Sequence, residues 1–320
     1  MKNFLKFIGK FSFVVTLTML LTFSSFAQIK LRRALDFNND NRADFTIFRP
    51  ANSTWYVLTS GNTFISQQFG QYSEDFMTPG DYDGDGRGDI AVWRETSGNW
   101  FRLNSSNNTF SQVQFGQTGD EPVARDYDGD GKTDIAVVRR TNGLMIWYVL
   151  RSASGFASTQ FGATTDFTAP GDYDGDGRFD IAVQRPGATN TAASNFYILT
   201  ATGAFSQVQF GQTSDLIVPG DYDGDGKTDL AVIREGSTAE ANLNWYILQS
   251  TTNTIRAVAF GATGTDLNVQ NDYDGDGKTD IAVWRDTNGT FYVLRSTDNN
   301  LTVVQWGQAN DYPVASYDTH

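Results

Sequence analysis

The sequence contains no cysteine and a single histidine, His320, which is its last residue. The absence of cysteine excludes disulfides, cysteine-ligated zinc and thiol catalysis. Because the one histidine stands at the end of the chain, neither a Ser-His-Asp triad nor a histidine-ligated metal inside the fold is expected. Beyond residue 27 the sequence also lacks any sustained helical period, so we expect a core built from strands.

Long apolar runs are absent outside the first 27 residues. That segment has three lysines among its first ten residues, an apolar stretch over about 11–26, and small residues at Ser25 and Ala27. The pattern predicts a secretory signal peptide over 1–27, with an uncleaved membrane anchor as the alternative. Residues 28–320 then form one domain that is secreted, either extracellular or periplasmic, without membrane insertion after cleavage.

Basic residues are scarce relative to acidic ones. The chain has 24 lysines and arginines against 37 aspartates and glutamates, which gives a formal net charge of -13. Such a surface argues against nucleic acid and anionic membranes as partners and attracts divalent cations.

The acidic residues follow a repeat. The phrase DYDGDG begins at Asp81, Asp126, Asp172, Asp221 and Asp272, and a weaker copy, DFNNDN, begins at Asp36. The interval of 45 to 51 residues suits one four-stranded propeller blade. The sequence therefore predicts an all-β fold, a six-bladed β-propeller of four-stranded antiparallel blades; a seventh blade would need a copy that the sequence does not show.

Each copy contains four short β-type segments, a to d. In the copy around Asp126 they span 122–126, 134–139, 146–150 and 155–161. Five of the seven prolines fall in segment a, which predicts an edge strand that lines the central channel, because proline cannot donate to a sheet ladder. In an up-and-down blade the a–b and c–d turns then share one face, and the b–c and d–a loops share the other.

The Asp-rich phrase is the predicted a–b turn. Its spacing, D-x-D-x-D-G-x-x-D, allows side-chain oxygens at positions 1, 3, 5 and 9 and the backbone carbonyl of position 7 to converge on one hard cation. Oxygen ligands alone, several of them carboxylates, favour Ca²⁺ over a transition metal. An EF-hand is excluded because position 12, Val92 in the second copy, is not glutamate. The alternative is a set of metal-free Asx turns.

The run from Phe210 to Val232 resembles the FG-GAP repeat of integrin-α propellers and of bacterial VCBS-type repeat proteins, and six copies of it cover nearly all of 31–318. The resemblance implies a propeller that binds about five to six Ca²⁺ ions at the matching positions. The first loop has Asn38 at position 3 and Asn41 in place of glycine, so its site should be weaker or empty. With the position-7 residues contributing carbonyls, the predicted ligands are Asp36, Asn38, Asp40, Arg42 and Asp44; Asp81, Asp83, Asp85, Arg87 and Asp89; Asp126, Asp128, Asp130, Lys132 and Asp134; Asp172, Asp174, Asp176, Arg178 and Asp180; Asp221, Asp223, Asp225, Lys227 and Asp229; and Asp272, Asp274, Asp276, Lys278 and Asp280.

Other residues recur once per copy. An arginine lies thirteen residues after the first loop aspartate, and segment c opens on an aromatic pair; we favour blade packing with the arginine stacked on an aromatic ring, and the alternative is a sugar site in every blade. A further aspartate lies six residues before the loop, in the predicted d–a turn, where it either caps the turn or belongs to a ring of acids at the channel mouth. These arginines are Arg49, Arg94, Arg139, Arg185, Arg234 and Arg285, and the aspartates are Asp75, Asp120, Asp166, Asp215, Asp266 and Asp311.

The tail, 311–318, copies the approach to a seventh loop and then ends. It duplicates segment a, which 30–35 is predicted to supply to the first blade. We expect one terminal strand to pair beside the other, or to replace it, and so to fasten the ring.

The most regular feature of the sequence is the repeat itself, which points to a binding role. We expect a monomeric, non-catalytic module for adhesion, binding or scaffolding, with a protein or glycan ligand that the sequence does not identify. One alternative is a carbohydrate-binding lectin. The other is a polysaccharide lyase or hydrolase, since paired carboxylates could act in so acidic a chain. No catalytic residue and no cofactor other than Ca²⁺ is predicted.

Overall fold

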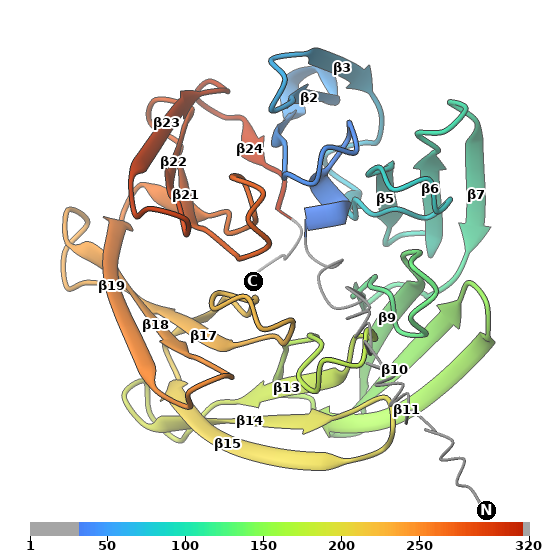
Figure 1. The fold of residues 1–320 in the computed structure, drawn as a ribbon. Coiled ribbons are helices and arrows are strands. Elements are labelled where there is room, and N and C mark those ends of the chain that lie inside the picture. The colour runs from blue at the N-terminus through green and yellow to red at the C-terminus, as the bar shows by residue number, and fades with distance from the viewer. Residues whose placement is uncertain (1–31, 316–320) are drawn as a thin grey trace, which may run out of the picture.

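The structure is a computed structural model that describes residues 32–315, and the predicted signal peptide, 1–27, lies outside the described residues. Within 32–315, 24 strands form six four-stranded antiparallel sheets around a central channel (Figure 1). The predicted all-β, six-bladed propeller is confirmed. Among the same residues, no helix is both long and apolar enough to cross a membrane.

The strands of the first three blades are named here in order from the channel outward. Blade 1 consists of β24 (Tyr312–Pro313), β1 (Phe45–Arg49), β2 (Thr54–Leu58) and β3 (Phe64–Gln68). Blade 2 consists of β4 (Asp75–Met77), β5 (Ile90–Arg94), β6 (Asn99–Leu103) and β7 (Phe110–Gln114). Blade 3 consists of β8 (Asp120–Pro122), β9 (Ile135–Thr141), β10 (Leu144–Arg151) and β11 (Gly155–Ala163).

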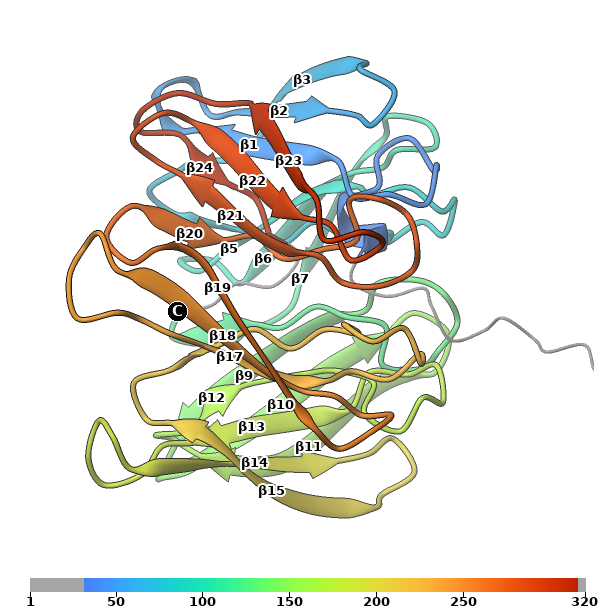
Figure 2. The ribbon, with the colours of Figure 1, turned by 60° about the vertical axis from the view of Figure 1, so that its left-hand side comes forward.

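The remaining blades follow the same order. Blade 4 consists of β12 (Phe167–Thr168), β13 (Ile181–Arg185), β14 (Ala193–Leu199) and β15 (Phe205–Gln212). Blade 5 consists of β16 (Leu216–Ile217), β17 (Leu230–Arg234), β18 (Asn242–Leu248) and β19 (Ile255–Ala262). Blade 6 consists of β20 (Asp266–Asn268), β21 (Ile281–Arg285), β22 (Thr290–Leu294) and β23 (Leu301–Gln305). In the turned view of Figure 2, blades 4, 5 and 6 lie one above another.

The burial of each strand explains its composition. In four of the six blades the second strand opens with four apolar residues, as in Ile90–Trp93 of β5, because neighbouring blades cover both of its faces. The third strand alternates between buried and half-buried residues, and the outer strand, as in β7, alternates between exposed and half-buried ones. The first aromatic of the third strand is fully buried in every blade, with an exposed fraction of at most 1%, and fills the space between blades: Trp55, Trp100, Trp147, Phe196, Trp245 and Phe291.

The inner strand is shorter and begins earlier than predicted. In blade 3 it covers Asp120–Pro122, where 122–126 is expected. Pro122 has no N–H to donate, and beyond it the ladder continues only through the hydrogen bond from Val123 N to Ala136 O and an isolated bridge between Arg125 and Asp134. The recurring aspartates therefore lie at or just before the start of the inner strand, where the sequence predicts a d–a loop.

The ring is fastened by the end of the chain. β24 pairs antiparallel with β1, with Tyr312 opposite Phe48 and Pro313 opposite Ile47 (Figure 1). This confirms that a terminal strand closes the ring by taking the inner position of blade 1. The strand predicted over 30–35 is wrong: in its described part, Arg32–Leu35 forms the 3-10 helix η1, because the strand position beside β1 belongs to β24.

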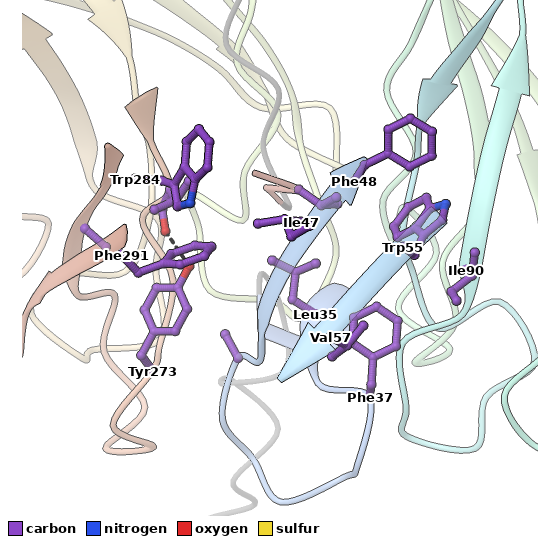
Figure 3. Close-up of a cluster of buried hydrophobic side chains, with 14 of the residues drawn as sticks. Leu35, Phe37, Ile47, Phe48, Trp55, Val57, Ile90, Tyr273, Trp284 and Phe291 are labelled. Carbon is purple, nitrogen blue, oxygen red and sulfur yellow. Dashed lines mark hydrogen bonds between the residues drawn. The ribbon is translucent and has the colours of Figure 1, made fainter. Parts of the chain in front are cut away.

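The closure buries a mixed core from blades 6, 1 and 2. Figure 3 shows Leu35, Phe37 and Ile47 between Trp55 on one side and Trp284 on the other. Phe45 stacks on Tyr273 of blade 6 with ring centroids 5.0 Å apart. Aromatic burial of this kind contributes strongly to stability, so the junction is packed as a core rather than joined by one strand pair alone. A short 3-10 helix, η2 (Pro50–Asn52), connects β1 to β2.

Candidate metal centre

Each Asp-rich loop joins the inner strand of a blade to its second strand. In the loop 81–89 the carboxylate of Asp81 lies at the centre of the bend: Oδ1 accepts the N–H of Gly84 at 2.7 Å and Oδ2 accepts that of Gly86 at 3.0 Å. Both glycines have positive φ, 84° and 88°, a conformation that glycine adopts without the steric cost of a Cβ. The spacing of the phrase is thus dictated by a backbone that wraps around its first aspartate.

The ninth position ties the loop to the rest of the blade. Asp89 is fully buried; its Oδ2 accepts the N–H of Tyr82 at 2.9 Å, and its Oδ1 accepts the N–H of Ser105, in the turn between the third and fourth strands, at 2.7 Å. The a–b and c–d turns therefore share a face, as predicted. The matching donors to position 9 are Ser60, Ser105, Ser152, Ala201, Ser250 and Ser296.

This c–d turn forms a second wall of the site, which our sequence analysis did not identify. The Ser106 hydroxyl donates to Asp83 and the Ser154 hydroxyl to Asp128, both at 2.6 Å. The signal was present in the sequence, since a serine stands one or two residues after the end of the third strand in five of the six copies. The position-2 tyrosine was missed as well: Tyr82 is buried, and its hydroxyl donates to Thr78 O at 2.8 Å, which anchors the start of the loop.

Five loops bring carboxylates close enough to share a metal ion. In each, three aspartates offer oxygen atoms that all lie within 4.8 Å of one another. Three loops unite positions 1, 3 and 5, and two unite positions 1, 3 and 9; the position-7 carbonyls stay predicted ligands. The groups are Asp81, Asp83 and Asp85; Asp126, Asp128 and Asp134; Asp172, Asp174 and Asp180; Asp221, Asp223 and Asp225; and Asp272, Asp274 and Asp276.

The buried carboxylates of the loops favour a bound cation. Asp128 Oδ1 is buried without a hydrogen-bond partner. Burial, only partly offset by backbone N–H donors, raises the pKa of Asp89 to about 6 and that of Asp134 to about 7. Carboxylates in this state are stabilised by a positive charge, and a donor set made only of oxygens fits a hard divalent ion. The residues present therefore fit a metal of the calcium type.

The first loop differs in the way the sequence suggests. Asn39 and Asn41 take the two glycine positions with φ of 58° and 67°, so the bend persists. However, the Asn38 amide donates to Asp40 Oδ2. Within the described loop, 36–44, no group of three acidic side chains gathers as in the other five.

The six loops are joined to one another in a closed circle. The carbonyl of position 1 in each loop accepts the N–H of position 8 in the next loop at 2.6–2.8 Å, and the last loop returns to the first through Ala43 N and Asp272 O. The other five bonds run from Gly88, Thr133, Phe179, Thr228 and Thr279 to the carbonyls of Asp36, Asp81, Asp126, Asp172 and Asp221. The geometry of each candidate site is thus coupled to that of its neighbours.

The recurring arginines and aspartates of the opposite face pair with each other. Arg94 donates through Nε and Nη2 to both oxygens of Asp75, and the matching bonds in the six blades measure 2.6–3.0 Å. Each guanidinium also lies 4.5–4.8 Å from the centroid of the second aromatic of the third strand. The packing interpretation of the arginines is confirmed. Their pairing with the recurring aspartates was not predicted, although both residues recur visibly in the sequence.

The same geometry corrects the other interpretations of these residues. The aspartate side chains are at most 3% exposed in the ion pairs, so they form no open ring of acids at the channel mouth. Each instead caps the preceding turn, as Asp75 Oδ2 does by accepting the N–H of Gln71. Each arginine is paired with an aspartate and also stacked on an aromatic ring. The recurring arginines, aspartates and aromatic residues are therefore structural.

Comparison with known proteins agrees with this architecture. A family model described as "FG-GAP-like repeat" matches 81–137, 126–183 and 172–232. No curated protein matches the sequence. An oligogalacturonate lyase in complex with manganese is 13% identical, covering 86% of this chain and 77% of its own, with a TM-score of 0.51. A streptogramin B lyase is 11% identical, with coverages of 89% and 90% and a TM-score of 0.47. At these identities the likeness concerns the fold alone.

Proposed function

This chain is an FG-GAP repeat β-propeller, and on that premise we propose that it is a secreted calcium-binding propeller that acts as a non-catalytic binding, adhesion or scaffolding module. The observation that carries the proposal is the set of five carboxylate groups, each with oxygens within 4.8 Å of one another, at the same position in five blades. The signal-peptide pattern over 1–27 supports a location outside the cytoplasm, where calcium is plentiful enough for sites of modest affinity.

A non-catalytic role is supported by what the recurring acids do. On one face they line the loops, and on the other they hold arginines in bidentate pairs. A catalytic centre in a repeat fold is expected to break the repeat with ionisable residues in one blade. The departures of this chain in that direction are small: Glu235 and Glu240 lie in an exposed loop, and Glu121 of β8 is paired with Arg140 at 2.7 Å.

The test is a calorimetric titration of the secreted form with CaCl₂. We expect five sites, with the first loop contributing weak binding or none, and we expect Mg²⁺ to bind much more weakly because it keeps its water shell. The double variant Asp83→Asn/Asp85→Asn should lower the stoichiometry by one, while Glu240→Gln, an exposed acid on the opposite face, should leave it unchanged. Absence of Ca²⁺ binding would overturn the proposal.

A glycan array with and without EGTA separates the binding module from the lectin. Calcium-dependent sugar binding would show that the protein is a lectin. Release of unsaturated or reducing ends from a panel of polysaccharides would show that it is an enzyme. We expect neither signal.

A further inference from the structure

The face opposite the metal loops contains a cavity of about 420 Å³. It lies among the inner strands of blades 1, 2, 5 and 6, with walls from the b–c loops at Glu235 and Asp286 and from the d–a segment 263–265. Its volume is within the usual range of about 300–1,000 Å³ for ligand sites. Since d–a and b–c loops meet only on this side of the blades, the cavity opens away from every aspartate loop.

The floor of the cavity is apolar and partly open to solvent. The residue that follows each recurring aspartate stands on the inner strand, and four of these six residues line the cavity: Phe76, Leu216, Leu267 and Tyr312. Leu267 is 45% exposed and Tyr312 is 40% exposed. The Tyr312 ring is held in place by Tyr72, which stacks on it at 5.4 Å and donates its hydroxyl at 2.7 Å. Large apolar side chains gathered in one exposed depression mark an interaction site.

The charge of the cavity is of one sign. Asp75 and Asp266 also line it, but each is neutralised by its arginine, Arg94 or Arg285. Glu235 and Asp286 are exposed and, within residues 32–315, have no ion-pair partner. No lysine or arginine is among the lining residues. A ligand that brings one positive charge beside an apolar group therefore complements both features.

We propose that this cavity is the docking site for a partner polypeptide that inserts a basic side chain, between Glu235 and Asp286, next to an aromatic or aliphatic side chain that packs on Leu267 and Tyr312. The inference rests on the proposed function as a binding module and gives that function a ligand class. It does not depend on calcium contacting the partner, because the metal loops lie on the other face.

The experiment uses four blocked tetrapeptides that differ only in their central pair: Lys-Phe, acetyl-lysine-Phe, Glu-Phe and Lys-Ser. Binding to the calcium-loaded protein is measured by NMR titration at low ionic strength. We expect the Lys-Phe peptide to bind at least about tenfold more tightly than each of the other three, because loss of either the charge or the ring removes one of the two contacts. Binding should weaken as salt is added.

Variants place the binding in the cavity. Glu235→Gln/Asp286→Asn should weaken the Lys-Phe peptide about three- to tenfold and leave the acetyl-lysine peptide unchanged. Leu267→Ser should weaken both. Glu240→Gln, an exposed acid outside the cavity, is the matched control and should change neither.

Equal affinity for the lysine and acetyl-lysine peptides, or affinity untouched by the cavity variants, would overturn the inference. These substitutions are at exposed positions, so unchanged melting curves will show that the variants fold. If calcium binds and stabilises as proposed while the peptides fail, the ligand class is wrong and the function as a calcium-loaded module stands. If calcium does not bind but the peptides do, the calcium-loaded module is wrong and the ligand class stands.

Discussion

Every blade buries carboxylates on both faces of the ring, but only on one face does an arginine pair with the buried carboxylate in every blade. On the loop face Arg87 and Arg178 pair only with the partly buried position-5 carboxylates of Asp85 and Asp176. In blade 6, Asp266 accepts two hydrogen bonds from Arg285, at 2.6 and 2.8 Å. Although burial alone raises its pKa, the arginine and the N–H of Ala262 outweigh that effect, and the pKa of Asp266 lies below its ordinary value. Asp280, on the other face, has backbone N–H donors but no cation, and burial with the nearby Asp274 charge raises its pKa to about 7.

The difference between the two faces shows where the protein itself compensates the charge of its buried carboxylates. A buried carboxylate is stabilised only when a cation or several donors compensate its lost hydration. The channel-mouth face meets that requirement with arginines that are part of the sequence. On the loop face, no ion pair of the described residues compensates the buried position-9 carboxylates, and an ion from solution can do so. We therefore expect the two faces to respond differently to chelation, truncation, pH and substitution.

Removing calcium should have the largest effect. One site saturated at a hundredfold excess over its Kd stabilises by about 2.7 kcal/mol, and several sites act together through the circle of loop-to-loop hydrogen bonds. We expect EGTA to lower the melting temperature by about 20 °C or more, measured by calorimetry against excess Ca²⁺ and against excess Mg²⁺. An unchanged melt in chelator would show that the loops need no ion and would erase the contrast between the faces.

Ending the chain at Gly307 should be the next largest perturbation. It removes β24, the buried Val314 and Asp311, and it leaves Arg49 without its partner. Loss of one member of such a partly buried pair costs about 2 kcal/mol, and the packing of Val314 in the closure core is lost as well. The truncated chain should therefore melt far lower in calcium and in chelator alike. Ending the chain after Ala315 keeps every described contact and should change nothing; if both truncations behave alike, the closure is not what fastens the ring.

The pH dependence of the metal-free protein should be weaker but of unusual sign. The native pKa values of about 6 for Asp89 and Asp229 and about 7 for Asp134, Asp180 and Asp280 lie above the unfolded value of about 3.9. The native state therefore binds more protons than the unfolded state between these values, and stability falls as pH rises. In EGTA the melting temperature should drop from pH 5 to pH 8; with calcium present it should rise over the same range, because protons compete with the ion. A metal-free melt that rises with pH would contradict the raised pKa values.

Matched aspartate substitutions in blade 6 separate the contributions of the two faces to stability. Asp266→Asn leaves Arg285 partly buried without its carboxylate and should cost about 2 kcal/mol whether or not calcium is present. Asp276→Asn should lower stability only in calcium, by weakening one site. Denaturant unfolding in calcium and in EGTA measures both. If the Asp276→Asn effect persists in EGTA, the loop carboxylate acts through hydrogen bonds rather than through a metal.

Repetition is what made the fold and the loops predictable. Six copies of one spacing identify the blade, and the a–b position of the aspartates follows from the strands around them. The Arg–Asp pairs were not predicted, because Asp75 and Arg94 are 19 residues apart and only the register of β4 on β5 brings them together. The inner strand supplied by 312–313 in place of 30–35 could not be decided either, since both segments resemble strand a and the choice depends on packing between the ends of the chain.

The smallest expected effect concerns a buried polar group that has neither an arginine nor an ion. Gln184 of β13 stands where other blades have Trp93, Val138 or Trp284, and it is fully buried with no partner for Nε2 or Oε1. Such a group costs about 1–3 kcal/mol of stability, so Gln184→Leu should raise the free energy of unfolding by about 1–2 kcal/mol in calcium and in chelator equally. Gln160→Leu, on the exposed outer strand β11, is the control and should have little effect. If Gln184→Leu instead lowers the melting temperature, an internal water satisfies the amide, and the interior of blade 4 holds its polar group as firmly as the arginines hold theirs.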